Sequence, residues 1–399
     1  VRNGTYRIHN KHDFISLSHY HISWDLLLNG EPVSAGKLPR LQTPPQGSTD
    51  IRLALAKPSM QAGDELSLVF HTRLRDATTW APQGHEVALE QISLARRKPA
   101  SIRLHAAAVI STTHAQHNVT LGEQRFSFDD TGLTAWQYRD QALLEQGPAL
   151  NIWRAPLDND GIKGWQGQDA KPLGRWRAAG IEQPSSTWQK LKVSGQGTRD
   201  LTILCQQTAT MRGGKIRIRT QYQFGANQSL LVRHQFSIDK SLPDLPRIGV
   251  RYRLADDYEQ LSWFGRGPHE TYVDRRTSGL VAVHRSTVSD QYVPYILPQD
   301  HGNLTDVRWL QLDSNAGASH IRISAATTLE ASASHYPHEL LTPLFHTYEV
   351  VPQPHTWVCL DAMQRGVGGA SCGPDTLEQY RVVPGEYTLA YQLSRGSQT

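Results

Sequence analysis

The sequence predicts an all-β protein, and three observations support that prediction. Apolar and polar side chains alternate with a period of two in several segments, most clearly at residues 216–224, 248–254 and 387–393. Helical periodicity is almost absent, and only residues 175–179 predict a turn or two of helix. Glycine and proline gather between the alternating segments, as turns require. Each segment has one apolar and one polar face, which is typical of antiparallel strands with one face in water.

Residues 1–96 predict a small, separate β-sandwich. The pair Asn29-Gly30 lies between two apolar stretches and predicts a two-residue hairpin turn. Prolines within residues 38–45 interrupt strand pairing, and alternation resumes at Ile51 and again at Leu66. Short strands at this spacing, over about 100 residues, are typical of an immunoglobulin-like sandwich.

A linker is predicted at residues 97–112, because the stretch that leads into it is charged, contains Pro99 and has no periodicity. From residue 113 to residue 399 the strands follow one another without a second change in composition. A β unit of this size predicts two large antiparallel sheets stacked on each other, a β-supersandwich, with long loops between strands.

Composition excludes several classes of partner. The net charge is only +4, with 41 basic residues scattered among 37 acidic ones, so no nucleic acid is expected. No apolar run is long enough to span a membrane. Cys205, Cys359 and Cys372 show no disulfide or metal spacing, which fits a reducing compartment, and we expect a cytoplasmic protein. The chain begins at Val1 rather than methionine, so we expect a piece of something longer.

Three motifs, in chain order, resemble one known family. They are NIWRAPLDND at residues 151–160, WFGRGPHETYVDR at residues 263–275, and the stretch 292–309 with YVPY, PQDHGN and TDVRW. Together they resemble the C-terminal domain of the large β-galactosidases of glycoside hydrolase family two. That domain has a galactose-mutarotase-like supersandwich fold. Residues 1–95, with ATTW and GHE, resemble the immunoglobulin-like domain that precedes it, so the resemblance covers essentially the whole chain.

The resemblance implies a five-domain enzyme that hydrolyses terminal β-D-galactosides with retention. Its two catalytic glutamates and its magnesium site lie in a (β/α)8 barrel that no part of this chain matches. Retaining chemistry needs two carboxylates about 5 Å apart. We therefore expect a non-catalytic C-terminal half, with no cofactor or metal of its own. Its expected partners are the barrel domain or large subunit, the β-galactoside substrate and further copies in an oligomer.

Two acidic clusters are interpreted as structural rather than catalytic. Asp158 and Asp160 lie in a loop bounded by proline and glycine, where we expect hydrogen bonds to the backbone and an ion pair with Arg154. The spacing lacks the further ligands that a calcium loop needs. Glu270 and Asp274, next to arginines, are expected to hold a bend between strands.

Histidines suggest two other sites, and neither is favoured. On a strand, His19 and His21 would share one face, but no third ligand accompanies them, so metal binding is not expected. An aldose mutarotase needs a general acid and a general base that face each other across a cleft. His269 and Glu270 are adjacent on a chain that we expect to be extended, so their side chains should point to opposite faces.

Two loops are the candidate substrate-binding sites, both at the rim of the pocket. The resemblance places the glycine-rich segment 366–374 at the mouth of the barrel, where some members have a tryptophan that stacks on the sugar. Counting back from Pro374 puts Cys372 at that position, next to Ser371. A thiol cannot stack as an indole does, so we expect only a place on the rim. A glycine-rich turn with a buried thiol is the alternative.

The second loop matches a segment that is mobile beside the active site in relatives, and its candidate residues are Arg212, Gly213, Gly214 and Lys215. An ordinary hairpin turn is the alternative there. A further functional alternative for the whole chain is a free-standing carbohydrate-binding module. Its ten tryptophans and 14 tyrosines include flat faces of the kind that stack on pyranose rings.

Overall fold

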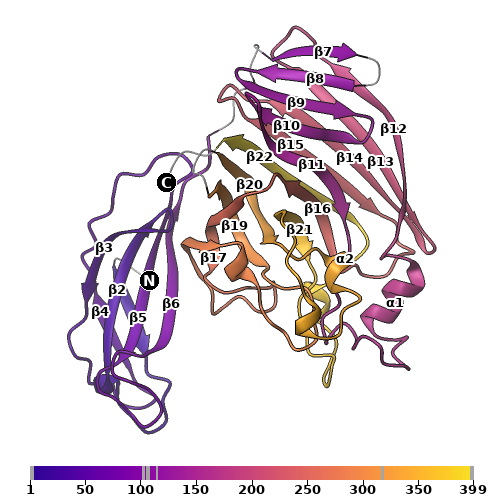
Figure 1. Cartoon of the computed structure of the whole chain (residues 1–399). Helices are drawn as coiled ribbons and strands as arrows, with labels where there is room; N and C mark the ends of the chain where they lie inside the picture. The colour runs from indigo at the N-terminus through magenta and orange to yellow at the C-terminus, as the bar shows by residue number, and fades with distance from the viewer. Residues whose placement is uncertain (1–3, 101–103, 105–107, 114–115, 316–318, 396–399) are drawn as a thin grey trace. The chain divides into compact units, whose positions relative to one another are not determined.

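The computed structural model describes residues 4–100, 104, 108–113, 116–315 and 319–395 (Figure 1). Two compact units are present. The first spans Val1–Ser101 and takes in Leu280–Val283, and the second spans Ile102–Gly279 and His284–Thr399. The predicted all-β class is confirmed, since strands make up nearly all of the regular structure. In the described part of the chain, no helix is both long enough and apolar enough to cross a membrane.

The first unit is a sandwich of a two-stranded and a four-stranded antiparallel sheet. The small sheet pairs β1 (Thr5–His9) with β4 (Ser48–Arg52), and the larger has the order β3 (Glu31–Lys37), β2 (Tyr20–Leu28), β5 (Glu65–Leu74), β6 (Glu86–Arg96). Tyr6 from the small sheet meets Phe70 from the larger one edge to face, with ring centroids 5.6 Å apart. The predicted hairpin turn is confirmed, because Asn29 and Gly30 both have positive φ, 52° and 82°, between β2 and β3.

The second unit is built on one hydrogen-bonded sheet of 16 strands, and only the first four residues of its β18, Leu280–Val283, are assigned to the first unit. Its strands are β7 (Val109–Thr113), β8 (Gln116–Leu121), β9 (Gln124–Asp129), β10 (Gly132–Tyr138), β11 (Gln141–Asn151), β12 (Ser185–Ser194), β13 (Thr202–Met211), β14 (Gly214–Phe224), β15 (Leu230–Ile238), β16 (Arg247–Leu254), β17 (Tyr258–Gly267), β18 (Leu280–Thr287), β19 (Leu304–Ser314), β20 (His320–Ser334), β21 (Trp357–Gln364) and β22 (Glu386–Arg395). The main order is β12-β13-β14-β15-β22-β20-β21-β16-β11-β10-β9-β8-β7, with β17, β18 and β19 joined to it through β20.

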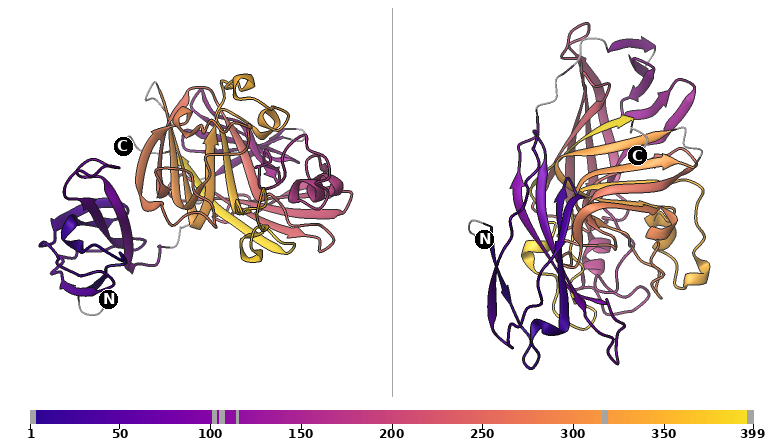
Figure 2. Two further views of the ribbon diagram at one scale, coloured as in Figure 1. Left: turned by 90° about the horizontal axis from the view of Figure 1, so that it is seen from below. Right: turned by 90° about the vertical axis from the view of Figure 1, so that its left-hand side faces the viewer.

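This large sheet curls until its two ends face each other, as the views in Figure 2 show. β9 and β14 lie near opposite ends of the ladder, yet the rings of Phe128 and Tyr222 meet with centroids 5.1 Å apart. Close to this ring contact, the backbone N–H of Leu133 in β10 donates to the Tyr222 hydroxyl in β14 at 3.4 Å. Apolar side chains from both layers fill one continuous core. The curl therefore produces two stacked layers from a single ladder.

Short helices and long loops connect the strands at the end of the second unit where α1 and α2 lie (Figure 1). The helices are α1 (Pro172–Ala179) and α2 (His338–Leu341), and the 3-10 turns of this unit are η2 (Ser289–Gln291), η3 (Thr347–Glu349) and η4 (Glu378–Tyr380). The remaining 3-10 turn, η1 (Leu17–His19), belongs to the first unit. The helical turn predicted at residues 175–179 is confirmed as part of α1. Within the predicted linker 97–112, residues 101–103 and 105–107 lie outside the described residues, and β7 begins at Val109.

Candidate functional site

The motif at residues 151–160 is built around a buried ion pair. The Arg154 guanidinium, which is fully buried, donates from Nε and Nη2 to the two carboxylate oxygens of Asp160, at 2.9 and 2.7 Å. Asp160 also accepts from the backbone N–H of Leu157 at 3.0 Å, and Arg154 Nη1 donates to the carbonyl of Arg365 at 2.7 Å. The structural interpretation of this pair is confirmed, whereas Asp158 is exposed and takes no part in it.

The glycine-rich segment 366–374 is held in place by side chains from other loops. The Asp274 carboxylate accepts from the backbone N–H groups of Val367 and Gly368, at 2.9 and 2.8 Å. Asn159 donates to the Gly368 carbonyl at 2.8 Å and accepts from the Ser371 hydroxyl at 2.6 Å. These contacts join two of the three sequence motifs, at residues 151–160 and 263–275, to segment 366–374, and the three segments form one loop cluster. Asp274 was expected to hold a bend and instead fastens this segment.

Glu270 is structural, as predicted, but its contacts fasten it mainly to residues 295–302 rather than only across its own bend. Its buried carboxylate accepts from the backbone N–H of Gly302 at 2.9 Å and from the Tyr272 hydroxyl at 3.2 Å, and it also bonds the Tyr295 hydroxyl. The neighbouring His269 is exposed and bonds Ser278 at 2.9 Å. The two adjacent side chains therefore do point apart, which leaves no facing acid and base at this position.

The predicted rim residue Cys372 is exposed, so the alternative of a buried thiol is wrong. Ser371 beside it is exposed as well, and it is tethered through Asn159. The Lys171 ammonium, at the start of α1, donates to the Ala370 carbonyl. The tip of the segment thus reaches solvent while its base is fixed by hydrogen bonds.

The second predicted loop is a tight hairpin turn between β13 and β14, in which Met211 pairs with Gly214. Arg212 donates from Nε to the carbonyl of Ala178 at 2.9 Å, which satisfies a free carbonyl at the C-terminus of α1. Gly213 completes the turn, and the Lys215 backbone N–H donates to Asp239 at 3.1 Å. α1 therefore contacts segment 366–374 at one end and this turn at the other, and the helix itself is about 12 Å long.

A buried polar network lies among the strands behind these loops. Arg247 donates to Asp361 at 2.7 Å and lies 3.4 Å from Asp300, which in turn accepts from Gln364 at 2.8 Å. Beside Arg247 and His301 lies a cavity of about 20 Å³, which is room for about one water molecule and far too little for a sugar. These carboxylates are therefore ion-paired in a site that admits no substrate.

Glu330 is the most perturbed carboxyl of this network. Burial raises its pKa to about 7, against the opposing effect of hydrogen bonds from Asn303 and from the Gln364 backbone. The folded protein therefore binds this proton more tightly than the unfolded chain does. The contribution of this carboxyl to the free energy of unfolding is therefore complete below its ordinary pKa near 4.5. That contribution is lost as the pH rises through about 7.

Glu330→Gln should accordingly stabilise the protein above pH 7 by about 3 kcal/mol and make little difference at pH 4.5. The amide removes the buried charge and can still accept from the Gln364 N–H. Urea unfolding at several pH values measures the difference between variant and parent. Glu123→Gln, at an exposed position, should give no such gain, and a Glu330→Gln difference that is the same at pH 5 and pH 8 contradicts the assignment.

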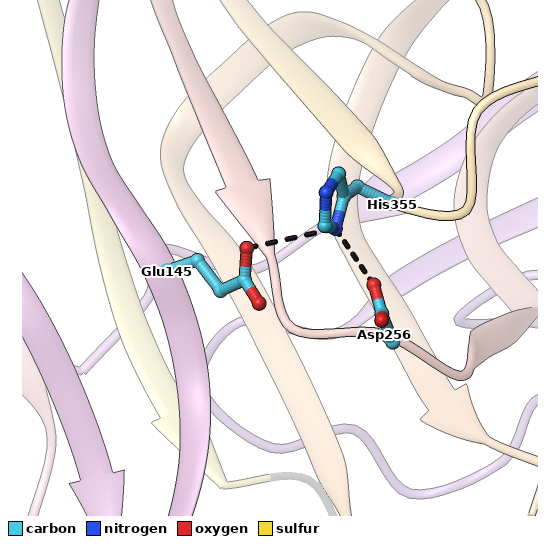
Figure 3. A group of neighbouring side chains, drawn as sticks. All are labelled: Glu145, Asp256 and His355. Carbon is cyan, nitrogen blue, oxygen red and sulfur yellow. Dashed lines mark ion pairs between the residues drawn. The ribbon is translucent and has the colours of Figure 1, made fainter.

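Among the described residues, Glu145, Asp256 and His355 form a group of side chains of the kind that can bind a metal. Figure 3 shows the His355 imidazole between the two carboxylates, with Nδ1 at 2.6 Å from Asp256 and 3.5 Å from Glu145. Arg253 Nε lies 3.2 Å from Glu145, so this carboxylate already has a cationic partner. We interpret the group as an ion-pair network. The two histidines considered earlier, His19 at the end of η1 and His21 on β2, do not belong to this group.

Sequence reasoning missed Lys163, whose buried ammonium donates to the carbonyls of Pro298, Leu341 and Leu344 at 2.6, 2.9 and 2.7 Å. Burial lowers its pKa to about 8. Lys163 therefore joins its own loop to the loop at Pro298 and to residues 341–344. No local sequence pattern predicts that role. Asn159 was also missed, although its place inside the motif at residues 151–160 was the available signal.

Two family models match the chain. The model described as the β-galactosidase small chain matches residues 120–393, and the model described as domain 4 of β-galactosidase matches residues 6–95. The domain 4 match lies within the first compact unit. The small-chain match covers most of the second unit and also takes in residues 280–283, which are assigned to the first.

Among curated relatives, β-galactosidases from Priestia megaterium and Arthrobacter sp. strain B7 are 29% and 30% identical over 92% and 93% of this chain. The chain spans 35% and 37% of their lengths. Solved structures of a Clostridium acetobutylicum galactose mutarotase-like protein and a Lactobacillus acidophilus galactose 1-epimerase each match 74% of this chain and 99% or 100% of their own, at 6% and 11% identity. Their TM-scores of 0.39 and 0.32 are too low to support a conclusion.

Proposed function

Because the chain belongs to the β-galactosidase small-chain family, we propose that it is the non-catalytic C-terminal part of a β-galactosidase. In this proposal it supports a catalytic barrel that lies elsewhere in the enzyme and completes the rim of the substrate pocket. The observation that carries the proposal is the construction of segment 366–374. Its base is fixed by Asp274 and Asn159, and its tip presents Ser371 and Cys372 to solvent. Loops held in this way suit contact with a partner surface or a ligand.

The burial and ion pairing of the carboxylates favour a structural role for this chain over a catalytic one. Asp160 and Asp361 are buried and paired with arginines, and the cavity beside Arg247 has room for about one water. A retaining glycosidase needs two carboxylates that reach a sugar from opposite sides, about 5 Å apart. The pairs found in the loop cluster and in the network behind it are committed to ion pairs instead.

The partners follow from the same proposal. The barrel domain or large subunit would supply the two catalytic glutamates and the magnesium site, and terminal β-D-galactosides would be the substrates. Oligomer formation and a cytoplasmic location belong to the proposal as well. The three cysteines, all within the described residues, are free thiols, which suits a reducing compartment.

Asp274→Ala in the assembled enzyme tests the rim assignment. Without the carboxylate, the N–H groups of Val367 and Gly368 lose their acceptor and segment 366–374 is released. We expect KM for a chromogenic β-galactoside to rise several-fold while kcat changes little, because the rim adds binding that is similar in the ground and transition states. Asp50→Ala, which removes an exposed carboxylate in the first unit, is the matched control and should leave both constants unchanged. An unchanged KM in a folded Asp274→Ala enzyme would refute the rim role.

A further inference from the structure

A groove in the second unit lies along residues 145–150 of β11. Pairing between β10 and β11 ends at Trp136 and Leu144, and β11 bulges twice against β16 between Leu144 and Ala149. β10 turns so closely over β11 that a Cβ on Gly147 would lie 1.5 Å from the Leu133 carbonyl oxygen. Residues 145–150 therefore form an irregular stretch of β11, and this stretch lines the groove.

The groove has the dimensions of a small-molecule site, with a volume of about 540 Å³. Gln146 to Leu150 of β11 form one wall, and Ser186, Trp188 and Gln207 of β12 and β13 form the other. The curl of the sheet brings these two walls together, since β12 is the terminal strand of the ladder. None of the predicted rim residues lines this groove.

The lining of the groove mixes apolar and uncharged polar groups and includes one aromatic side chain, Trp188. The apolar residues are Leu133, Pro148, Ala149, Leu150 and Pro184. Trp188 is 43% exposed, although it is a large apolar side chain. Amide and hydroxyl groups surround it, among them Gln146, Gln207 and Ser186, and the Gln207 amide donates to the Ser186 hydroxyl at 2.9 Å. Glu145 is the single charged lining residue, and Arg253 at 3.2 Å already pairs with it.

This lining selects one class of ligand. Anions find no free cation among the lining residues, and a strongly apolar ligand would leave the amides without partners. An added peptide strand is disfavoured on the β11 side because Pro148 has no N–H to donate. A pyranose ring has an apolar face for the indole and equatorial hydroxyls for the amides. We propose that the groove binds a neutral pyranose saccharide, with Trp188 stacked on the ring and Gln146 and Gln207 bonded to its hydroxyls.

The proposal does not depend on the barrel, so the chain itself is sufficient for the test. Lactose is titrated into the purified chain and followed by calorimetry and tryptophan fluorescence. We expect saturable binding with a dissociation constant of about 1 mM, as suits an open site with one aromatic surface. Trp188→Ala should weaken binding by about tenfold or more. Gln207→Ala should weaken it by a smaller factor, and it serves as the second variant if Trp188→Ala does not fold.

The matched control is Trp80→Ala, because Trp80 is 65% exposed and belongs to the first unit. Binding by that variant should equal that of the parent chain. Absence of saturable binding, or equal binding by parent and folded Trp188→Ala, overturns the proposal. So does a dimer in sedimentation that dissociates in Trp188→Ala, because a second copy would then be the occupant. A failure of the Asp274 test leaves these outcomes unaffected.

Discussion

Replacing Arg154 by alanine should lower the free energy of unfolding of the second unit by about 3–5 kcal/mol. The substitution leaves the Asp160 carboxylate fully buried without its bidentate partner, and only the Leu157 N–H and the more distant Arg365, at 3.6 Å, still face it. The Arg365 carbonyl loses a donor at the same time. Urea unfolding followed by tryptophan fluorescence measures the loss.

An exposed ion pair of the same unit provides the control. Arg217 lies 2.7 Å from Asp239, and its side chain is 57% exposed. Water replaces such a contact readily, so Arg217→Ala should unfold at nearly the parent midpoint. A similar midpoint for Arg154→Ala and Arg217→Ala would mean that the buried pair does not hold the loop cluster together.

Gly147→Ala should destabilise the second unit by about 3 kcal/mol or more, because the new methyl group would meet backbone rather than a movable side chain. The nearest atoms are the carbonyl oxygen and carbon of Leu133, at 1.5 and 2.6 Å. β10 would have to move away from β11, which disturbs the core around Leu133 and Trp136. Thermal unfolding and near-ultraviolet circular dichroism report the change.

Gly369→Ala is the matched substitution, since the nearest atom to its added methyl group is the Pro374 carbonyl oxygen at 3.6 Å, an ordinary contact. The variant should melt with the parent protein. A Gly147→Ala protein as stable as Gly369→Ala would show that β10 does not pass as close to β11 as described, and the groove between the walls would then have a different shape.

Local patterns predicted the strands, the Asn29-Gly30 turn and the helical turn in α1, because each depends on residues within a few positions of one another. The Arg154–Asp160 pair was also within reach, since both partners lie in one motif. The resemblance added the order of the two units, which no periodicity could have supplied.

Contacts between distant segments could not be predicted in the same way. Asp274 bonds N–H groups 93 and 94 positions away, and Lys163 reaches carbonyls 135 to 181 positions away. The groove depends on the curl of a 16-stranded sheet, which brings Trp188 opposite Pro148. Alternation fixes the face on which a side chain lies, but it carries no information on which strands meet after the sheet curls.

The most direct test of the account is the rate at which the purified chain, without any barrel-bearing part, hydrolyses a chromogenic β-galactoside. We expect no turnover above the uncatalysed rate, because Asp160 and Asp361 are buried and paired with arginines. Activity is expected only when the chain is joined to, or mixed with, the part that carries the catalytic glutamates. Measurable turnover by the chain alone, retained through purification and absent from a preparation of the Arg154→Ala variant, would contradict the non-catalytic role.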